Sequence, residues 1–597
     1  MTKRRISHSR KTRSATAGLI VFAGMDRVKL LMIGFGAMSL LIITRLFVVQ
    51  VMEHGFYEQW ANDQHTLAKQ LLPERGEIYA QDQFSDSGLA VIATNQTVYH
   101  VFANPKQIPI VDKQKTADAV ADVLGLDSAM VLERLSKEND VYEPLKHGVS
   151  EQELNALEKI IHEQQLPGID WTPEDARLYP EGKATSAITG FVGMADDHRK
   201  GQYGLEGYFD TQMAGTPGSI RKELDAFGRF IAIGDNSIVE AQDGDSLILT
   251  IDKNIQYTAC WMLSDTVESL KAEQGSVIVM NPKTGAILAM CNAPEYDPNH
   301  YSDVDDIQLY MNDAVSDQYE PGSVLKPIAV AAAINEGKIT PYTTYEDTGE
   351  VKIEGYSINN SDFKAHGVVD MTTVLELSLN TGAVYAVQQI GNERWNNYIQ
   401  QFGFGKKTGI TLNGENAGNI SSVAKLQDIY SATSSYGQGM TITPLQLVQA
   451  YSAFANDGVM MKPYIVDRVV KSNGYQEVTQ PEPAGQPISP ETARTVGAML
   501  VRVVDGPHAK PARLDGYFVA GKTGTAQVPK ENGVGYDEHL HKDTFIGFVS
   551  VSDPQAVILV KIDKPQSPWA ETSAAPLFGK LSQYLVNYLK IQPDRSE

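Results

Sequence analysis

The sequence is poor in cysteine: Cys260 and Cys291 are the only two among 597 residues. So few cysteines exclude a disulfide-rich scaffold and a cysteine-ligated zinc site. One disulfide between them is possible, but spacing alone cannot decide whether they pair. We interpret them as two buried, unreactive thiols, and the pairing stays open at this point.

The sequence also lacks a recognisable spacing of metal ligands. The nearest group of ligand-type residues is His539-Leu-His541 beside Asp537 and Glu538, and its composition is more typical of a polar loop than of a metal site. We therefore expect neither a metal nor a cofactor.

Basic residues are in short supply, since 51 Lys and Arg stand against 73 Asp and Glu, for a net charge of -22. This deficit argues against a nucleic-acid-binding surface. The charge is also uneven, because residues 1–27 hold seven Lys or Arg and one Asp, which leaves about -28 for the rest of the chain. The pattern predicts a disordered basic tail followed by an acidic body.

Long apolar runs are absent apart from residues 28–51, VKLLMIGFGAMSLLIITRLFVVQV, which Lys29 and Arg45 interrupt. A helix of this length covers the roughly 30 Å hydrocarbon core of a bilayer if Arg45 is tolerated near its outer end. A cleaved signal peptide is the alternative, but the run is long and no small-x-small cleavage site follows it. We expect a retained single-pass membrane helix, with a cytoplasmic N-terminus and everything after residue 52 outside the cytoplasm.

The chain is long enough for two or three domains. We expect a cytoplasmic basic tail over 1–27, a transmembrane helix over 28–51, a spacer or docking module over 52–244 and a larger domain over 245–597. The last boundary falls where LILTIDKNIQ, after Asp243-Gly-Asp245, predicts a strand followed by a helix.

Hydrophobic periodicity predicts a mixed fold. Strands from both ends of the last domain enclose a long helical middle, which indicates one antiparallel sheet closed by distant segments and an α+β class. The expected helices cover 116–137, 150–165 and 577–589, and the expected strands cover 89–101, 276–280, 286–291, 517–520, 544–551 and 556–562.

The first chemical motif is S-x-x-K in residues 320–327, EPGSVLKP. If a helix begins here, Ser323 and Lys326 share one face, and a desolvated Lys326 amine can take the proton of the Ser323 hydroxyl. The pattern alone is weak because it recurs in this chain. The other copies are Ser219/Lys222, Ser361/Lys364 and Ser422/Lys425.

A second motif, S-x-N, would supply a proton relay and a side-chain amide. Ser378-Leu-Asn380 lies between two apolar helical stretches, where a short connection can hold side chains rigidly. The alternative, Ser357-Ile-Asn359, lies in a sequence with the composition of a loop. We favour Ser378 and Asn380.

A third motif, K-T-G, occurs three times. Lys283-Thr-Gly285 fits a hairpin turn and Lys407-Thr-Gly409 a glycine-rich loop. The third copy continues a strand, YFVAGKTGTAQV, and offers an extended edge to a peptide. Its residues are Lys522, Thr523 and Gly524, with Thr525 next.

The ordered set of motifs resembles that of class B penicillin-binding proteins, which are monofunctional peptidoglycan transpeptidases with one membrane anchor. The resemblance covers nearly all of the chain beyond the basic tail. One departure is QDQFSDSG, where the family usually continues its Arg-Gly motif with Asp-Arg-Asn-Gly. Other matching motifs are Arg75-Gly76, Arg177-x-Tyr-Pro180, Gly190-Phe-Val-Gly193, Gly204-Leu-Glu206, Leu249-Thr-Ile-Asp252 with Gln256, and Tyr436-Gly-Gln-Gly-Met440 with Thr443-Pro-Leu-Gln446.

The resemblance implies a catalytic domain of the serine β-lactamase-like fold and a pedestal or dimerisation-type module over 52–244. It implies Ser323 as nucleophile, Lys326 as its base, and Ser378 with Lys522 as the relay to the leaving group. Asn380 would hold the donor peptide. Lys522, Thr523, Gly524 and Thr525 would form the seat of the terminal carboxylate, and backbone N–H groups of Ser323 and Thr525 the oxyanion hole.

The implied substrate is a stem peptide ending in D-Ala-D-Ala, and β-lactams would acylate Ser323. The implied partners are the membrane, a polytopic glycan polymerase and division or elongation proteins, with septation favoured over elongation. Alternatives are an elongation-type transpeptidase, a D-Ala-D-Ala carboxypeptidase or β-lactamase, and a non-catalytic scaffold or β-lactam sensor. The sequence leaves open the stem-peptide chemistry, the acceptor amine, drug susceptibility and oligomeric state.

Overall fold

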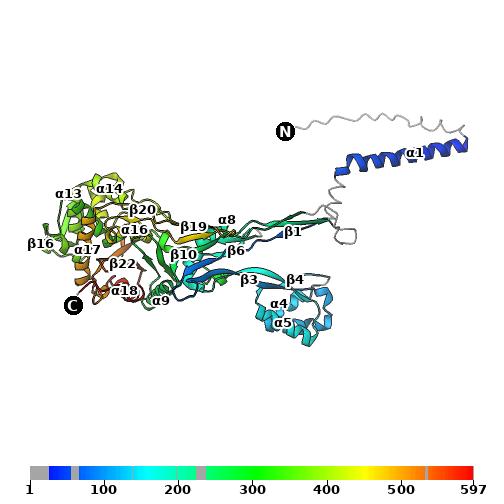
Figure 1. The fold of residues 1–597 in the computed structure, drawn as a ribbon, viewed down its shortest axis with the longest axis horizontal. Helices are drawn as coiled ribbons and strands as arrows, with labels where there is room; N and C mark the ends of the chain where they lie inside the picture. Colours follow the sequence, from blue (N-terminus) through cyan, green and yellow to red (C-terminus); the bar gives the residue numbers. More distant parts are fainter. Residues whose placement is uncertain are drawn as a thin grey trace, which may run out of the picture. The chain divides into compact units, whose positions relative to one another are not determined.

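The structure is a computed structural model that describes residues 26–55, 66–137, 139–195, 198–223, 237–530 and 535–595 (Figure 1). Nearly all of the expected basic tail therefore lies outside the described residues. The chain forms two compact units, one of residues 1–72 and 217–241, the other of residues 73–216 and 242–597.

The first unit contains the apolar helix α1 (Arg27–Phe47), which continues as a π-helical turn over Val48–Met52. Arg27–Met52 is long and apolar enough to cross a membrane, and it has no buried residue. Arg45, the charge expected near the end of the span, lies 3.8 Å from the Glu53 carboxylate. The unit also has a three-stranded antiparallel sheet of β1 (Thr66–Leu71), β8 (Gly218–Glu223) and β9 (Ser237–Val239).

The N-terminal part of the second unit is built on a seven-stranded sheet in the order β19-β18-β10-β2-β3-β4, with β5 also paired to β3. The predicted strand over 89–101 is confirmed as β3, which is long enough to belong both to this sheet and to a small α/β core. The strands are β2 (Ile78–Gln81), β3 (Leu89–Ala103), β4 (Glu143–Val149), β5 (Ile169–Leu178), β10 (Ser246–Asp252), β18 (Val466–Val470) and β19 (Gln476–Val478).

The prediction of a single helix over 116–137 is wrong. It is two helices, α3 (Lys113–Leu124) and α4 (Ser128–Leu135), because Gly125 takes a left-handed conformation at φ +64° and ends α3. The helix expected over 150–165 is confirmed as α5 (Glu151–Gln164), which begins with a capping box between Ser150 and Glu153.

Three of the matching sequence motifs meet at one buried carboxylate. The side chain of Glu206 is fully buried and receives hydrogen bonds of 2.7 Å from Nε of both Arg75 and Arg177. Arg177 also donates to the carbonyl of Gly76 at 2.7 Å. The buried charge of Glu206 is therefore paired and hydrogen-bonded.

The C-terminal part contains the expected antiparallel sheet of five strands, in the order β12-β11-β23-β22-β21. Residues near 280 pair with residues near 560, so the sheet is closed by distant segments as predicted. The strands are β11 (Gln274–Met280), β12 (Ile287–Ala293), β21 (Val519–Pro529), β22 (Tyr536–Val549) and β23 (Val557–Asp563).

Helices cover this sheet. α9 (Lys253–Ser269) and the predicted C-terminal helix α18 (Ala574–Tyr588) contact each other and the strands, while α16 (Pro444–Ala455) and α17 (Pro490–Asp505) contact the sheet and each other. Alternation along β22 separates the two sets, since Phe545 packs against Phe578 of α18 and Phe548 lies near Gly497 of α17.

The helical middle consists of α11 (Lys326–Asn335), α12 (Met371–Glu376), α13 (Asn380–Ile390), α14 (Asn392–Gln401) and α15 (Asp428–Ser435). The short α-helices and strands of the second unit not yet named are α6 (Ser186–Thr189), α7 (Gly204–Tyr208), α8 (Asp210–Met213), α10 (Asp313–Ser316), β6 (Phe191–Ala195), β7 (His198–Gln202), β13 (Thr344–Asp347), β14 (Glu350–Ile353), β15 (Tyr356–Asn359), β16 (Gly367–Asp370), β17 (Met460–Met461) and β20 (Pro483–Gly485).

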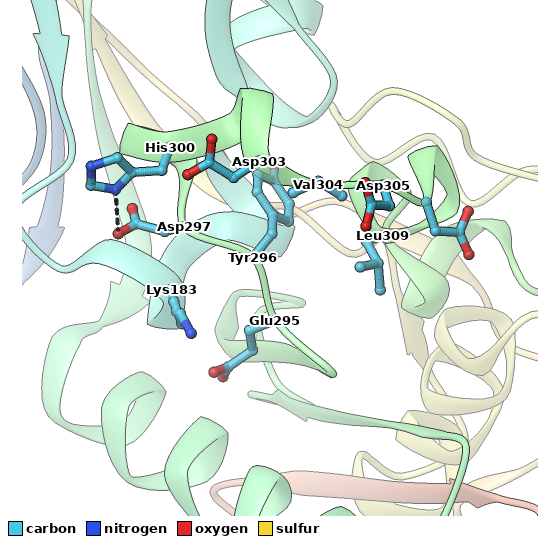
Figure 2. A pocket seen from close by; sticks show the side chains of 10 residues that line it. Lys183, Glu295, Tyr296, Asp297, His300, Asp303, Val304, Asp305 and Leu309 are labelled. Atoms are coloured by element: carbon cyan, nitrogen blue, oxygen red, sulfur yellow. Dashed lines mark hydrogen bonds and ion pairs between the residues drawn. The ribbon is translucent and has the colours of Figure 1, made fainter. Parts of the chain in front are cut away.

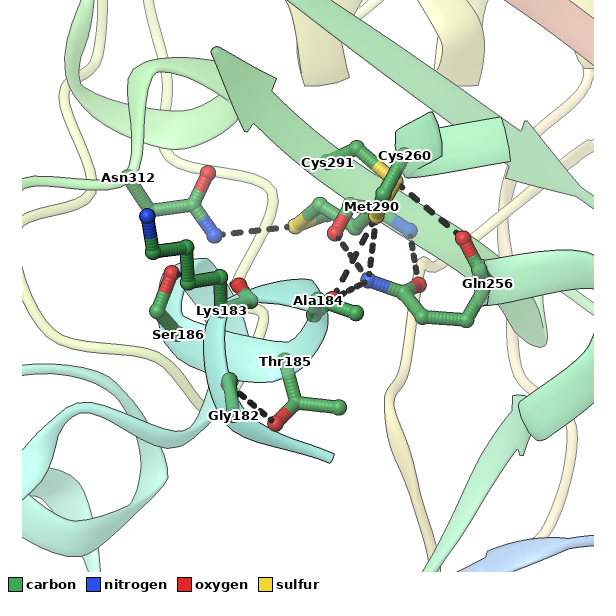
Figure 3. Close-up of a disulfide and its surroundings, with 10 residues drawn as sticks. All are labelled: Gly182, Lys183, Ala184, Thr185, Ser186, Gln256, Cys260, Met290, Cys291 and Asn312. Atoms are coloured by element: carbon green, nitrogen blue, oxygen red, sulfur yellow. Dashed lines mark hydrogen bonds between the residues drawn. A yellow bond between two sulfur atoms is a disulfide. The ribbon is translucent and has the colours of Figure 1, made fainter. Parts of the chain in front are cut away.

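The expectation of two free thiols is wrong, because Cys260 and Cys291 form a disulfide with an S–S distance of 2.07 Å (Figure 3). α9 lies along β12 and brings the two Cα atoms to 5.2 Å, a contact that a 31-residue separation does not reveal. Gln256, one turn before Cys260, binds both the N–H and the carbonyl of Met290 at 2.8 Å and so fixes the helix on the strand (Figure 3).

The prediction of a polar loop at His539-Leu-His541 is also wrong, since both histidines lie in β22. The partner strand decides this, because His541 is opposite Gln527 of β21 in the ladder. The His541 ring is hydrogen-bonded to Asp543 at 2.9 Å.

Candidate active site

Ser323 lies in a 3-10 turn, Gly322–Leu325, that leads directly into α11. The turn is built on close backbone contacts, since a Cβ at Gly437 would lie 2.2 Å from the carbonyl oxygen of Gly322. Gly322 itself has φ +62°, which favours glycine. Ser323 is partly exposed, whereas Lys326, one turn later, is fully buried.

Ser378 joins α12 to α13 and receives a hydrogen bond from Lys326. The Lys326 Nζ donates to the Ser378 hydroxyl at 3.1 Å and also to the Ser378 carbonyl. Ser378 has φ +57°, a conformation that costs energy for a residue with a side chain and that clusters at functional sites.

Lys522 reaches the same hydroxyl from the sheet. It lies in β21, the edge strand, and its Nζ donates to Ser378 Oγ at 3.0 Å and to the Thr523 carbonyl at 3.1 Å. The fold therefore brings Lys326, Ser378 and Lys522 together from three separate elements.

The two amines are unusual because both are fully buried. Desolvation, followed by repulsion from Lys522, holds the pKa of Lys326 well below its ordinary value. Desolvation also lowers the pKa of Lys522 to about 7. A neutral lysine amine is a base, so the burial gives the site the proton acceptor that a serine nucleophile needs.

β21 packs directly on the turn that carries Ser323. A Cβ at Gly524 would lie 3.0 Å from both the Pro321 carbonyl oxygen and Val324 Cγ1. The absence of a side chain at Gly524 therefore lets the strand approach the turn, and Ser323 lies between Pro321 and Val324. Within the described residues, the Ser323 hydroxyl has no hydrogen bond to Lys326, Ser378 or Lys522.

The remaining predicted residues occupy the edges of this cluster. Asn380 is the first residue of α13 and donates from Nδ2 to the Asn359 carbonyl at 2.7 Å. Thr523 and Thr525 alternate with Lys522 along β21, so their side chains point to the opposite face. The Thr525 hydroxyl accepts a hydrogen bond from the Ala570 N–H at 3.1 Å.

The side chains of the competing motif copies take no part in the lysine–serine cluster, although the Asn359 carbonyl accepts a hydrogen bond from Asn380. Ser357 and Asn359 form strand β15 rather than the loop their composition suggested. Lys283, in the turn between β11 and β12, forms an ion pair with Asp553. Thr408, in a loop, is hydrogen-bonded to Glu415.

Two supporting contacts were not foreseen from the sequence. Glu320 accepts from the Gly439 N–H at 2.9 Å and from the Tyr536 hydroxyl at 2.8 Å, which ties the segment before Ser323 to a distant loop and to the start of β22. Thr381, next to Asn380, donates to Asp347 at 2.7 Å and so anchors the start of α13. The glycines of the 436–440 motif were the only signal for the first contact, and no signal marked the second.

A cavity of about 660 Å³ lies elsewhere, lined by Lys183 in the turn before α6 and by the segment after β12 (Figure 2). Its lining is strongly acidic, including Glu295, Asp297, Asp303 and Asp305, and contains none of the predicted site residues. The acidic lining suits neither a carboxylate substrate nor the serine chemistry of the lysine cluster.

Comparison with known proteins agrees with this architecture. Residues 70–249 match the Penicillin-binding Protein dimerisation domain, and residues 275–583 match the Penicillin binding protein transpeptidase domain. Stage V sporulation protein D of Bacillus subtilis is 32% identical over 570 residues, covering 94% of this chain and 86% of the relative. Penicillin-binding protein PbpB of Mycobacterium tuberculosis is 32% identical over 496 residues, covering 79% of this chain and 71% of the relative.

Solved structures show the same fold. Penicillin Binding Protein 2X from Streptococcus thermophilus superposes with a TM-score of 0.71 at 24% identity, covering 88% of this chain and 80% of that one. Penicillin binding protein 3 of Mycobacterium tuberculosis, in complex with aztreonam, has a TM-score of 0.67 at 26% identity, covering 88% of this chain and 98% of that one.

The fold and the lysine–serine cluster define a penicillin-binding serine transpeptidase of cell-wall synthesis. The chain belongs to the class B penicillin-binding proteins. Among the residues that the structure describes, one helix is long and apolar enough to span a bilayer, as expected of a membrane protein.

Proposed function

We propose that Ser323 is the nucleophile of this transpeptidase and that Lys326 is its base. The Ser323 hydroxyl adds to the carbonyl of the penultimate D-Ala, and its proton passes to Lys326. The C–N bond to the terminal D-Ala then breaks, and the proton reaches the leaving nitrogen through Ser378. The observation that supports this assignment is the pair of buried amines that share the Ser378 hydroxyl.

The acyl-enzyme is released by an amine of a neighbouring stem peptide, which forms the cross-link and restores the Ser323 hydroxyl. Asn380 holds the amide of the donor peptide. The edge strand β21 pairs with the extended substrate, whose terminal carboxylate lies against Thr523, Gly524 and Thr525, while Lys522 supplies positive charge from the buried face of the strand. Backbone N–H groups of Ser323 and Thr525 bind the oxyanion.

We propose further that the N-terminus is cytoplasmic and that both folded modules lie outside the cytoplasm. The basic residues before α1 support this orientation. The Cys260–Cys291 disulfide supports it as well, because disulfides persist in oxidising compartments.

The cellular role we propose is cross-linking at septation, together with a polytopic glycan polymerase and division proteins. The family resemblance over nearly the whole chain supports this role. A fluorescent fusion should gather at division sites, and a signal spread along the lateral wall would indicate an elongation role.

The chemistry is tested by intact-mass analysis of the full-length protein in detergent after exposure to penicillin. Wild type should gain the mass of one penicillin, and Ser323→Ala should gain none. Ser361→Ala is the matched control, because Ser361 has the same S-x-x-K spacing in an exposed turn and should label like wild type. Labelling of Ser323→Ala would overturn the assignment.

A second assay separates transfer from hydrolysis. Incubation with donor and acceptor stem peptides should give cross-linked dimers, and release of D-Ala without dimers would identify a carboxypeptidase instead.

A further inference from the structure

Three adjacent strands in the N-terminal part of the second unit carry a group of potential ligands outside the active site. His100 lies on β3, His147 on β4 and Glu174 on β5. In the β3–β5 ladder His100 is opposite Thr172 and Glu174 is opposite Val98, so Glu174 lies diagonally across from His100 on the same face. The other face of β3, which includes Val101 and Ala103, packs on the helices of the small α/β core.

His100 is a buried histidine with an unused ring nitrogen. Its side chain is covered by His147, Tyr142 and Phe102, and only 5% of the residue is exposed. The Nδ1 atom lies 3.3 Å from the Tyr142 hydroxyl, whereas Nε2 is buried without a hydrogen-bond partner. A buried polar atom without a hydrogen-bond partner raises the free energy of the folded state, and a ligand bound to Nε2 would remove this penalty.

His147 and Glu174 complete the group. The His147 ring stacks on the His100 ring with centroids 3.7 Å apart, and its Nδ1 lies 3.0 Å from a Glu174 carboxylate oxygen. One nitrogen from each ring and one carboxylate oxygen all lie within 4.8 Å of one another. Among the described residues this is the one trio of His, Cys, Asp or Glu side chains that meets this condition.

We propose that His100, His147 and Glu174 bind a zinc ion. Two imidazoles and one carboxylate are a donor set that zinc takes up with three protein ligands and one open position. The site is open on one side, because the His147 side chain is 64% exposed and the Glu174 side chain 27% exposed. A water molecule can therefore fill the fourth position.

The ion can enter only after the exposed side chains move. Bonds of about 2.1 Å in a tetrahedron place ligand atoms roughly 3.4 Å apart, so the widest separation must close by about 1.4 Å. The nitrogen lone pairs of two stacked rings run side by side, so the His147 ring must also turn off the His100 ring, and its exposure leaves room for this rotation.

A bound ion would fasten β4 and β5 to the central strand β3. The three ligands are 47 and 27 residues apart in sequence and lie on different strands, so no local spacing motif could reveal them. This is why the sequence predicted no metal site. Without an ion, the trio is a pair of stacked rings beside a carboxylate and leaves His100 Nε2 unsatisfied.

The test measures zinc binding by the full-length protein in detergent, produced without a polyhistidine tag. Apo protein is titrated with zinc sulfate against a chromophoric chelator, and bound zinc is counted by mass spectrometry after desalting. Glu174→Gln and His147→Gln are compared with wild type. His162→Gln is the matched control, because it removes an exposed histidine of α5 in the same small core.

Wild type and His162→Gln should each retain one zinc per chain and unfold at a higher temperature when zinc is present. Glu174→Gln and His147→Gln should bind at least about tenfold more weakly and lose the zinc-dependent rise in unfolding temperature. Labelling of Ser323 by fluorescent penicillin in all four proteins shows that the variants are folded. Equal zinc binding in wild type and Glu174→Gln, or no zinc retained by wild type, would overturn the proposal.

Discussion

The Lys522 amine lies 3.0 Å from the hydroxyl of Ser378, although 144 residues separate the two in sequence. The Lys326 amine lies 3.1 Å from the same hydroxyl. Two ammonium groups sharing one buried hydroxyl would repel each other, so at least one of these lysines is neutral in the free enzyme. Desolvation is the main cause of the lowered pKa of each amine, and repulsion from Lys522 lowers the pKa of Lys326 further.

Replacing Ser378 with alanine should slow acylation by penicillin about 10²- to 10⁴-fold, because the shared proton relay is lost. Stopped-flow measurement with a fluorescent penicillin gives the rate. Ser357→Ala removes the serine of the competing S-x-N copy on β15 and should react like wild type. Equal rates for Ser378→Ala and wild type would remove Ser378 from the mechanism.

The pH dependence of acylation should show a descending limb near neutrality. Lys522 must be protonated to receive a carboxylate, and its pKa in the free enzyme is lowered to about 7, so the second-order rate constant should fall as the pH rises through that value. Lys326 acts in its neutral form. Because its pKa is held well below the ordinary lysine value, it can act as a base at pH values below this descending limb.

The Lys522→Arg variant stays charged at all accessible pH values and should lose the descending limb, even if its overall rate is lower. Lys407→Arg, in the loop copy of K-T-G, should keep the wild-type profile. An unchanged limb in Lys522→Arg would assign that titration to another group.

Gly524→Ala should impair acylation because the new Cβ would press on the turn that carries Ser323, 3.0 Å from the Pro321 carbonyl oxygen. A displacement of this kind costs about 10- to 100-fold in rate. The control is Gly497→Ala on α17, where the nearest atom would be 3.7 Å away. That variant should acylate normally and be slightly more stable, as alanine is favoured over glycine within a helix.

Removing the disulfide with Cys260→Ala and Cys291→Ala together should lower the free energy of unfolding by about 2–4 kcal/mol, because the bond closes a loop of intermediate length. Denaturant unfolding of the full-length protein measures the loss. A reductant should bring wild type close to the double variant and leave the double variant unchanged. Insensitivity of wild type to reductant would mean that the two sulfurs are not bonded in the protein.

Hydrophobic periodicity in the sequence predicted most helices and strands correctly. A glycine and a strand pairing explain the two failures. The expected hairpin of β11 and β12 and the C-terminal helix α18 are confirmed, because their apolar residues repeat strongly. The stretch over 116–137 has a continuous helical period, yet Gly125 divides it. His539 and His541 have the composition of a loop, but both lie in β22, where His541 pairs with Gln527 of β21.

The sequence by itself determined the membrane helix, the order of the modules and the motif residues, because apolar runs and short spacings are local properties of a chain. Only the tertiary structure decided which copies of S-x-N and K-T-G meet Lys326, since the sheet closes with segments from both ends of the domain. It also paired Cys260 with Cys291 and gathered His100, His147 and Glu174 on three strands. Such contacts depend on strand order and register, which long-range packing sets and no local pattern encodes.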